Sequence, residues 1–362
     1  MGSASLRRKS GDEFNIEVLQ EDKKSLNLKS KNVIMATGAR AKSLPNIIPD
    51  GKSIWTYKEA MVPNTLPKSI LVIGSGAIGI EFASFYNDLG VDITVVEVLD
   101  RILPAEDIDI SNFALKSFEK QGIKIKTSST VKSLKTSKGK ISVQIETMAG
   151  SEEVSVEKVI LAVGIIGNTE NLGLENTSAK VSNGQLVVDK WGATHEPGLH
   201  AIGDLVGAPW LAHKASHEGV ICVERIAGLE NVHPLDSSNI PGCTYSRPQV
   251  ASVGLTQKLA EDAGHKVRVG HFPFIGNGKA IALGEMDGFV KTVFDATTGE
   301  LLGAHMIGAE VTEMIQGYTV ARTLETTENE LLNTVFPHPT LSEMMHESVL
   351  DAFDRAIHIS VS

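Results

Sequence analysis

The stretch I-L-V-I-G-S-G-A-I-G, residues 70–79, places a glycine-rich turn directly after four apolar residues. The residues that follow, Ala77–Leu89, predict a helix, and a glycine then provides a natural stop for it. In this pattern Gly74 permits a tight turn, Gly76 lets another group approach the backbone, and Gly79 allows the helix to pack closely on the strand. The stretch therefore predicts a strand–turn–helix unit with backbone N–H groups directed at an anion.

The turn has the G-x-G-x-x-G spacing of a Rossmann dinucleotide-binding unit, and an acidic residue follows where such a unit needs one. Glu97 lies 18 residues after Gly79, at the end of the predicted strand Ile93–Glu97. A carboxylate there accepts hydrogen bonds from both ribose hydroxyls and repels a 2′-phosphate, which favours NAD over NADP. Glycines alone often only tighten a turn, but strand, helix and acid together make a dinucleotide site the stronger interpretation.

The rest of the chain shows two other kinds of pattern. Residues 63–182 alternate strands and helices, which predicts an α/β domain with a parallel sheet, whereas 241–362 hold four strands and then two helices, which predicts an antiparallel α+β domain. Residues 1–62 contain a hairpin and short strands without a covering helix, and residues 183–240 return to short strands and one helix. A self-standing domain should not begin in this way, so we expect that part of a domain is missing. The predicted helices are 77–89, 112–121, 213–227, 310–324 and 342–354, and hairpins are predicted at 14–28 and, around Lys138-Gly139, at 130–147.

Charge and composition exclude several classes of protein. The chain has 34 basic and 44 acidic side chains, a net charge of −10, so it is a poor binder of nucleic acid or of an anionic membrane. No apolar run approaches the ~20 residues of a membrane span, and residues 1–10 lack the apolar stretch of a secretory signal. Two cysteines, Cys222 and Cys243, form no disulfide framework, which favours a reducing compartment. We expect no nucleic-acid partner, no membrane span and no metal site.

Weaker candidate sites lie at other strand ends and near the C-terminus. The turns A-T-G-A at 36–39, A-V-G at 162–164 and A-I-G-D at 201–204 are, taken singly, more often plain turns than ligand contacts. Asp204, at the end of the third turn, is expected to cap a helix. The residues P-H-P at 337–339 predict a stiff extended segment, and T-L-S-E at 340–343 fits a capping box. From the residues alone, therefore, a histidine in this segment is a weak candidate for a catalytic base.

Taken in order, these motifs resemble the pyridine nucleotide-disulfide oxidoreductase flavoproteins and, among them, the dihydrolipoamide dehydrogenases. The resemblance implies an FAD domain, an inserted NAD domain, a C-terminal interface domain and a homodimer. It assigns 1–62 with 183–240 to the FAD domain, 63–182 to the NAD domain and 241–362 to dimerisation. The stretches that carry it are 33–38, 74–81, 201–204, 211–214 and H-P-T-L-S-E at 338–343.

The same resemblance implies cofactors, FAD and NAD, and the residues that bind them. Asp204 would bind the flavin's ribityl chain, Glu81 would reach the nicotinamide, and His338 would be the catalytic base, supplied across the dimer. Glu343 would hold and polarise the ring of His338. The implied FAD contacts are Thr37, Gly38, Ala39, Asp204 and the Trp210–His213 segment, with Leu211, Ala212 and His213 at the ring edge. The implied NAD contacts are Gly74, Gly76, Ile78, Gly79, Glu81, Glu97, Val131 and Gly164.

The sequence departs from this family in one important respect. The family begins with its own FAD-binding G-x-G-x-x-G unit and a C-x4-C redox disulfide, and neither motif precedes Gly74. Cys222 and Cys243 lie 21 residues apart and are interpreted as a buried helix residue and a small strand residue. Because the family passes electrons from dihydrolipoamide through the disulfide and FAD to NAD, we expect this chain by itself to be inactive. We also expect it to begin just upstream of the family's first hairpin and to bind FAD weakly.

The resemblance also implies partners and a location. The partners are the lipoyl domains of 2-oxoacid dehydrogenase complexes or of the glycine cleavage system. The location is the cytoplasm of a bacterium or the mitochondrial matrix of a eukaryote. Two other functions stay open: a non-catalytic module that binds NAD and dimerises, and a disulfide-free NADH–flavin oxidoreductase. The second is weaker, because such an enzyme does not need the base of an H-P-T-x-S-E motif.

Overall fold

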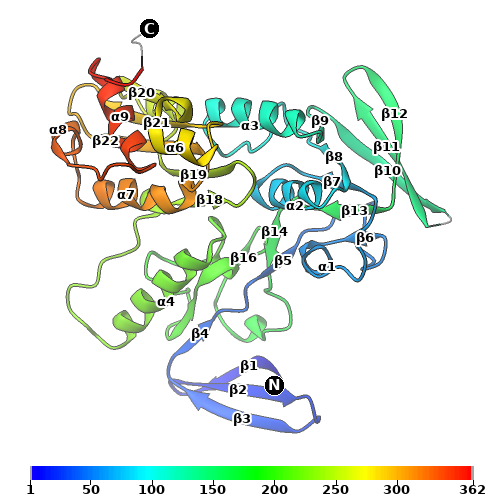
Figure 1. The fold of residues 1–362 in the computed structure, drawn as a ribbon. Helices are drawn as coiled ribbons and strands as arrows, with labels where there is room; N and C mark the ends of the chain where they lie inside the picture. Colours follow the sequence, from blue (N-terminus) through cyan, green and yellow to red (C-terminus); the bar gives the residue numbers. More distant parts are fainter. Residues whose placement is uncertain (1, 138, 360–362) are drawn as a thin grey trace. The chain divides into compact units, whose positions relative to one another are not determined.

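The computed structural model describes residues 2–137 and 139–359, and the chain divides into two compact units (Figure 1). The first unit comprises Met1–Lys42 and Ile165–Ser237, and the second comprises Ser43–Gly164 and Ser238–Ser362. In the described part of the chain no helix is both long enough and apolar enough to cross a membrane.

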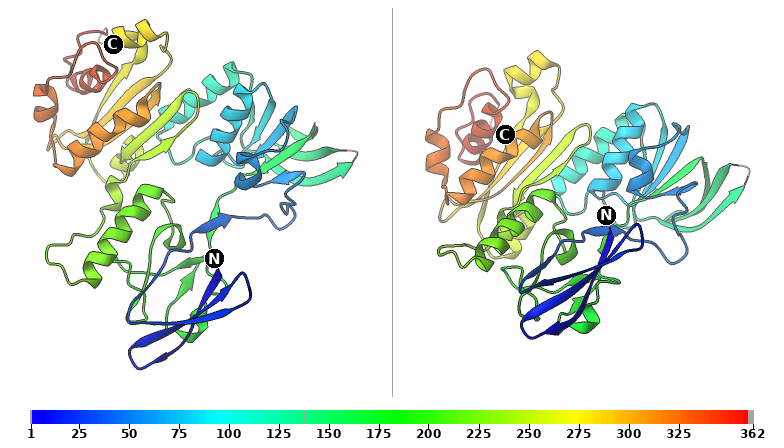
Figure 2. Two further views of the ribbon diagram at one scale, coloured as in Figure 1. Left: turned by 60° about the horizontal axis from the view of Figure 1, so that its bottom comes forward. Right: turned by 90° about the horizontal axis from the view of Figure 1, so that it is seen from below.

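The first unit begins with a three-stranded antiparallel sheet, which the two views of Figure 2 show as a separate layer at the start of the chain. The hairpin predicted at 14–28 is confirmed, with Phe14 opposite Ser30. The first strand was not predicted, because its residues are mostly polar and exposed and so lack an alternating pattern. The strands are β1 (Gly2–Ser10), β2 (Glu13–Gln20) and β3 (Ser25–Ser30).

Pairs of short strands and one long helix complete the first unit. The helix α4 (Ala212–Ile226) matches the predicted helix to within one residue at each end. A small apolar core, which includes Phe14 and Leu205, joins these pieces. The pairs are β4 (Val33–Met35) with β17 (Leu199–Ala201), parallel, and β5 (Ala39–Ala41) with β14 (Ile165–Gly167) and β15 (Val181–Ser182) with β16 (Gln185–Leu186), both antiparallel.

The second unit contains the predicted parallel sheet, whose strand order is β6-β13-β7-β8-β9. All its neighbouring strands run parallel, as the alternation of strands and helices predicts. Its strands are β6 (Ile54–Trp55), β7 (Ser69–Ile73), β8 (Asp92–Val96), β9 (Lys124–Lys126) and β13 (Lys158–Leu161), and its helices are α1 (Tyr57–Met61), α2 (Ala77–Asp88) and α3 (Ile108–Lys120).

A second hairpin extends into a three-stranded antiparallel sheet beside the parallel one (Figure 1). The pairing of residues 130–137 with 140–147 is confirmed, although Lys138 of the predicted turn lies outside the described residues. The third strand was not predicted, because its first four residues are glycine, serine and two glutamates. The strands are β10 (Thr130–Ser137), β11 (Lys140–Thr147) and β12 (Gly150–Val156).

The C-terminal part of the second unit is the predicted antiparallel sheet, with strand order β18-β19-β22-β21-β20. Strand β18 adds a fifth strand to the four that were predicted. Every residue of β21 and β22 is buried. Both faces of these strands are covered, because α7 and α9 pack against the sheet and α3 contacts β22. The strands are β18 (Gly242–Thr244), β19 (Gln249–Gly254), β20 (Val267–Pro273), β21 (Phe289–Asp295) and β22 (Leu301–Gly308), and the helices are α5 (Gln257–Asp262), α6 (Gly278–Leu283), α7 (Val311–Thr323), α8 (Glu328–Asn333) and α9 (Glu343–Ala352).

Helix α3 begins four residues earlier than the sequence predicted, because Asp107 caps it. The Asp107 side chain accepts a hydrogen bond from the Asp109 N–H at 3.0 Å. The same carboxylate accepts one from the Lys291 Nζ at 2.8 Å, and both of these side chains are only 1% exposed. Lys291 also pairs with Asp109 at 2.6 Å. A buried ion pair therefore joins α3 to strand β21.

The ionisation of Asp107 depends on this pair. Burial would raise the pKa of Asp107, but the hydrogen bonds from Lys291 and from the Asp109 N–H outweigh burial and lower it. A carboxylate with a lowered pKa stabilises the fold above the pKa of the unfolded chain, and that contribution is lost as the pH falls through the folded pKa.

We expect Lys291→Met to lower the free energy of unfolding by about 3–5 kcal/mol at neutral pH, because it leaves a buried carboxylate without its partner. The loss should shrink under acidic conditions, where Asp107 becomes protonated. Urea denaturation at several pH values measures it. The control is Lys258→Met, which removes an exposed partner of Asp262 and should change little. Equal losses in the two variants would contradict the role of the buried pair.

Candidate functional site

The glycine turn between β7 and α2 is fixed by close backbone contacts. Gly74 has a φ of +99°, and a Cβ on it would lie 2.4 Å from the Ala162 carbonyl oxygen. A Cβ on Gly79 would lie 2.1 Å from the Gly74 carbonyl oxygen. A Cβ on Gly76 would meet nothing within 4 Å. Two of the three glycines are thus required by the chain itself, and the third borders open space.

The predicted NAD residues meet at one edge of the parallel sheet. Gly164 follows β13, Gly74 follows β7, Glu97 follows β8, and Val131 lies just after β9, at the start of β10. These four strands are consecutive in the sheet order, so their carboxyl ends lie side by side. Ligands of open α/β sheets bind at this edge. The structure therefore brings together residues that are up to 90 positions apart in the sequence.

Glu97 is more strongly engaged by the chain than the sequence predicted. One oxygen, Oε2, accepts hydrogen bonds from the Ser75 N–H at 2.8 Å and the Ser75 hydroxyl at 2.7 Å. The other, Oε1, accepts one from the Leu99 N–H at 2.9 Å, and the residue is 6% exposed. A carboxylate has about four lone-pair sites, so this conformation leaves about one for a ribose hydroxyl. Glu97 therefore also holds the glycine turn in place.

Two further predicted NAD residues, Ile78 and Glu81, lie on α2 and are half-buried. The Glu81 Oε1 accepts a hydrogen bond from the Tyr245 N–H at 2.9 Å. Burial raises the pKa of Glu81, and this hydrogen bond only partly opposes the shift. Helix α2 thus connects the glycine turn at its start to the segment after β18, and the sequence did not indicate this contact.

In the first unit, the turn that carries Asp204 is held by an ion pair beneath it. Glu218 Oε2 accepts a hydrogen bond from the Gly203 N–H at 2.7 Å, and Lys214 donates to the Gly207 carbonyl at 3.2 Å. Lys214 and Glu218 also pair with each other at 2.9 Å. The half-buried Asp204 lies in a 3-10 turn, and its side chain caps no helix. The expectation that Asp204 would be a helix cap is therefore wrong. Its carboxylate has no partner among the described residues, which suits a hydroxyl-rich ligand.

The segment of Leu211, Ala212 and His213 forms the N-terminal end of α4. Leu211 is the N-cap, and no side chain caps the helix. The first N–H groups of a helix lack intrahelical partners, and the helix dipole makes this end positive. The position suits electronegative atoms at the edge of a flavin ring.

Asn168, which the sequence did not point to, holds the turn of Thr37, Gly38 and Ala39 through hydrogen bonds. Its N–H donates to the Gly38 carbonyl at 2.9 Å, and its side-chain amide donates to the Thr37 carbonyl at 2.9 Å. The Thr37 hydroxyl donates to the Asn168 carbonyl at 2.8 Å. Arg40 adds a hydrogen bond to the Asn168 side-chain oxygen at 3.1 Å. The only sequence signal was Asn168's place soon after the glycine that ends a predicted strand.

His338 and Glu343 form the predicted pair. The His338 Nδ1 lies 2.9 Å from Glu343 Oε1, and the Thr340 N–H donates to Glu343 Oε2 at 2.9 Å. The predicted capping box is only half formed, because the Thr340 hydroxyl donates to the Pro337 carbonyl and Ser342 is the N-cap of α9. Glu343 therefore does two jobs: it holds the histidine ring and it fixes the backbone of the preceding turn.

The ionisation of Glu343 follows from these contacts. Burial would raise the pKa of Glu343, but the hydrogen bonds from the Thr340 N–H and from His338 outweigh burial and lower it. A carboxylate only accepts hydrogen bonds, so the Nδ1 of His338 is the donor and Nε2 is left as the basic nitrogen. The His338 side chain is 78% exposed and borders a cavity of about 600 Å³.

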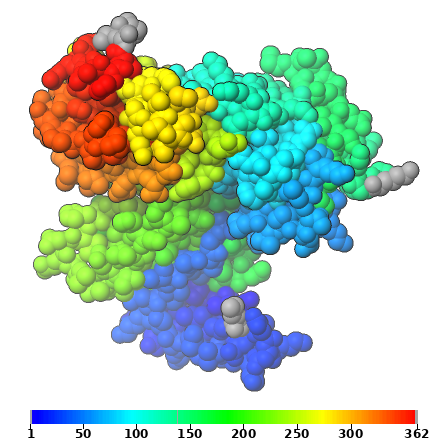
Figure 3. Space-filling view, viewed as in Figure 1, coloured from blue at the N-terminus to red at the C-terminus, as the bar shows by residue number. Residues whose placement is uncertain are grey.

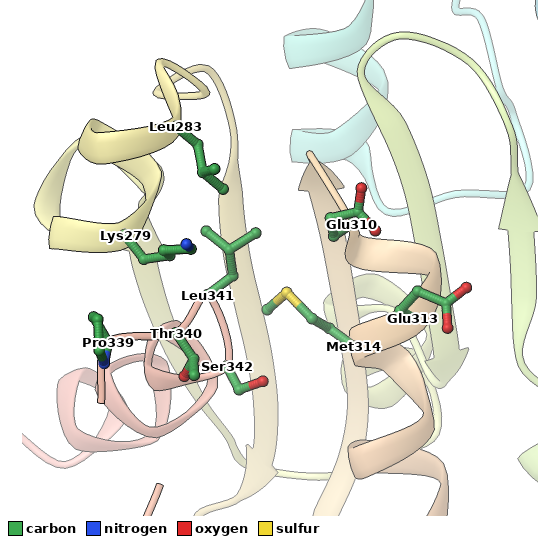
Figure 4. Close-up of a pocket in the computed structure, with 9 residues that line it drawn as sticks. All are labelled: Lys279, Leu283, Glu310, Glu313, Met314, Pro339, Thr340, Leu341 and Ser342. Carbon is green, nitrogen blue, oxygen red and sulfur yellow. The ribbon is translucent and has the colours of Figure 1, made fainter. Parts of the chain in front are cut away.

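A smaller cavity of about 350 Å³ lies at residues 339–342, just after His338 (Figure 4). Leu341 and Met314 form its apolar floor, with Lys279 on one side and Glu310 and Glu313 on the other. Figure 3 shows the same region from outside, where the segment around α6, in yellow, lies beside the C-terminal segment, in red. The segment that carries His338, residues 338–343, therefore borders two cavities of the second unit.

The two cysteines match their predicted places. Cys222 is buried in α4, Cys243 is half-buried in β18, and neither is in a disulfide. Burial raises the pKa of both thiols, which keeps them protonated at neutral pH and poorly nucleophilic. Among residues 2–137 and 139–359, no group of three His, Cys, Asp or Glu side chains is arranged to hold a metal ion.

Comparison with known proteins identifies the class. The family model for pyridine nucleotide-disulphide oxidoreductases matches residues 8–219, and the model for the dimerisation domain of the same family matches residues 240–349. The chain belongs to the pyridine nucleotide-disulphide oxidoreductase family. The fold class predicted from the sequence is therefore confirmed, and the dimerisation domain indicates a homodimer.

Curated relatives narrow the class to dihydrolipoyl dehydrogenases. Proteins of that name are 58% identical over 330 residues in Rhizobium etli, 57% over 334 residues in Zymomonas mobilis and 44% over 359 residues in Bacillus subtilis. These alignments cover 91%, 91% and 99% of this chain and 69%, 71% and 73% of the respective relatives. The chain is an oxidoreductase of the dihydrolipoyl dehydrogenase type, and the cofactors of that type are FAD and NAD(H).

Solved structures agree with this assignment. The crystal structure of LpdA from Mycobacterium tuberculosis matches with a TM-score of 0.89 and 28% identity, covering 96% of this chain and 76% of LpdA. The flavoprotein disulfide reductase RclA from Escherichia coli matches with a TM-score of 0.87 and 24% identity, covering 98% of this chain and 78% of RclA, which shows a shared fold.

Two glycines of the turn should respond differently to the same substitution. We expect Gly76→Ala to weaken NADH binding about tenfold or more with little change in thermal stability, because its Cβ would enter only the open space. We expect Gly79→Ala to cost roughly 1–3 kcal/mol of stability, because its Cβ would overlap the Gly74 carbonyl. Calorimetric titration and thermal unfolding measure the two effects. Unchanged NADH affinity in Gly76→Ala would place the pyrophosphate elsewhere.

Glu97 should set the preference between the two nucleotides. We expect NADH to bind more tightly than NADPH, and Glu97→Ala to narrow the gap by about 1.5–3 kcal/mol, the value of a hydrogen bond to a charged group. Titration of both nucleotides by calorimetry tests this. Asp92→Ala is the control, because Asp92 is an exposed acid at the opposite end of the same strand. Equal or tighter binding of NADPH by the unmodified chain would refute the assignment.

Proposed function

We propose that the described residues form the NAD-binding and acid–base parts of an enzyme that oxidises protein-bound dihydrolipoamide. The observation that carries this proposal is the hydrogen-bonded pair of His338 and Glu343 at the border of a cavity. A dithiol must lose protons when it is oxidised, because the thiolate is the reactive form. A histidine held by a carboxylate supplies an acceptor for such a proton at neutral pH.

The residues of this chain would act as follows. Glu343, kept ionised, accepts the Nδ1–H of His338 and fixes the orientation of the ring. The Nε2 atom then takes a proton from a substrate thiol and returns it to solvent later. The bound cofactors supply the electron and hydride transfer chemistry. In the family the base is supplied across the dimer, and we propose the same arrangement for His338.

We propose cofactor contacts on the residues that the resemblance implies. For NAD the supporting observation is the open space at Gly76, with Glu97, Val131 and Gly164 at the neighbouring strand ends. For FAD the supporting observation is the carboxylate of Asp204, which has no partner among the described residues. Glu218 and Lys214 hold the turn that carries it. The assignment of 1–62 with 183–240 to FAD, 63–182 to NAD and 241–362 to dimerisation stays a proposal. The structure pairs β14 with β5 and β6 with β13, and both pairs join residues 1–62 to residues 63–182.

The partners we propose are the lipoyl domains of 2-oxoacid dehydrogenase complexes or of the glycine cleavage system, because dihydrolipoamide is presented on such domains. A bacterial cytoplasmic or mitochondrial matrix location also stays a prediction. A second candidate function, a non-catalytic module that binds NAD and dimerises, stays open.

The role of His338 can be tested in a chimera that joins these 362 residues to the part of the Rhizobium etli relative that they do not match. We expect the chimera to reduce NAD with dihydrolipoamide, and His338→Gln to lower kcat by ~10²–10⁴, the usual value of a general base. Glu343→Gln should lower kcat less, because the imidazole remains. The control is His265→Gln, which removes a histidine from a carboxylate partner, Asp295, that does not border the cavity.

Two outcomes would contradict the proposal. Undiminished turnover in the His338→Gln chimera would show that another group accepts the proton. A chimera that binds NADH but does not turn over would favour the non-catalytic module.

A further inference from the structure

Every polar atom of Ser75, the second residue of the glycine turn, is engaged by the chain that follows β8. Its N–H and its hydroxyl both donate to Glu97 Oε2, at 2.8 and 2.7 Å. Its carbonyl accepts a hydrogen bond from the Leu103 N–H at 3.0 Å. The residue is 0% exposed. Its hydroxyl therefore acts on Glu97 from a fixed position inside the turn.

The backbone of Glu97 is also fixed, so its carboxylate moves only by rotation of the side chain. The Glu97 N–H donates to the Lys126 carbonyl, and the Glu97 carbonyl accepts from the Ser129 N–H, both at 2.8 Å. Three hydrogen bonds set the orientation of the carboxylate. Two of the donors are the backbone N–H groups of Ser75 and Leu99, and the third is the Ser75 hydroxyl. The hydroxyl is thus the part of this arrangement that a side-chain substitution can remove.

Two cations near Glu97, one along the chain and one on the neighbouring strand, are engaged elsewhere. Arg101 donates to the Pro104 carbonyl at 2.9 Å. Lys126, on β9, pairs with Glu152 at 2.7 Å. The charge of Glu97 is therefore left to act on a nucleotide, where a carboxylate repels a 2′-phosphate.

We propose that Ser75 is a positioning residue that sets the nucleotide preference through Glu97. Its hydroxyl holds the carboxylate so that the remaining lone-pair site accepts a ribose hydroxyl and the charge faces the position of a 2′-phosphate. Without this hydroxyl the carboxylate can turn away, and the penalty against the phosphorylated nucleotide falls. Specificity is a difference of two affinities, so a small rotation of one charged group changes it. This inference rests on the proposed NAD site.

Ser75→Ala tests the role of the hydroxyl, by calorimetric titration of the full chain with NADH and with NADPH. We expect the ratio of NADH affinity to NADPH affinity to fall about three- to tenfold. The fall should be smaller than in Glu97→Ala, because the Ser75 N–H keeps one hydrogen bond to the same oxygen. If Ser75 only shaped the turn, both nucleotides would bind more weakly by the same factor, because both carry the same pyrophosphate.

Ser111→Ala is the matched control. The Ser111 hydroxyl is also buried and donates to the Leu103 carbonyl at 3.1 Å, so the variant removes a hydroxyl from the same loop without changing a contact of Glu97. Its ratio of affinities should equal that of the unmodified chain, and thermal unfolding verifies that each variant is folded. A ratio that falls as far as in Ser75→Ala would show that any loosening of this loop relaxes the preference, and would overturn the proposal.

A double variant distinguishes an effect through Glu97 from an independent one. If Ser75 acts through Glu97, adding Ser75→Ala to Glu97→Ala should leave the ratio of affinities unchanged. A further fall in the double variant overturns the inference. An unchanged ratio in Ser75→Ala, with the effect of Glu97→Ala intact, overturns the inference alone and leaves the NAD site in place. An unchanged ratio in Glu97→Ala overturns the proposed role of Glu97 and this inference with it.

Discussion

The carboxylate of Asp107 joins helix α3, which follows strand β8 of the parallel sheet, to the C-terminal antiparallel sheet of the larger unit. It caps α3 and binds the ammonium of Lys291 on β21, and both side chains are almost completely buried. An isolated buried charge is very costly, so this pair fixes the position of α3 over the antiparallel sheet. Phe113 and Phe289 stack edge to face across the same contact, at 5.5 Å between ring centroids. The nucleotide edge and the C-terminal segment that carries His338 are therefore parts of one packed body.

Buried or half-buried glutamates hold three loops of the proposed site. Glu97 holds the glycine turn through Ser75, Glu218 holds the turn of Asp204, and Glu343 holds the turn before α9. In each case a carboxylate oxygen accepts backbone N–H groups that the loop itself leaves unsatisfied. Such hydrogen bonds to a charged acceptor are stronger than neutral ones. Loops that contact ligands can thus remain irregular and still have a defined conformation.

This arrangement explains how His338, the proposed base, can be both exposed and well oriented. His338 is 78% exposed, yet its Nδ1 is bound to a carboxylate whose other oxygen is bound to the backbone. The ring therefore keeps one nitrogen for orientation and one for chemistry.

The sequence by itself determined the parallel sheet, through its alternation of strands and helices, and the glycine turn and the acid at the end of β8, through residues close together in the chain. The pairing of His338 with Glu343 was implied by the family resemblance. The sequence pattern missed β1 and β12, whose residues are mostly polar, and it placed the start of α3 too late. Only the tertiary structure decided the roles of Lys291, Asn168 and Ser75. Each acts on a partner brought near by folding, at a distance of 184 positions for Lys291 and Asp107, and no local pattern records such contacts.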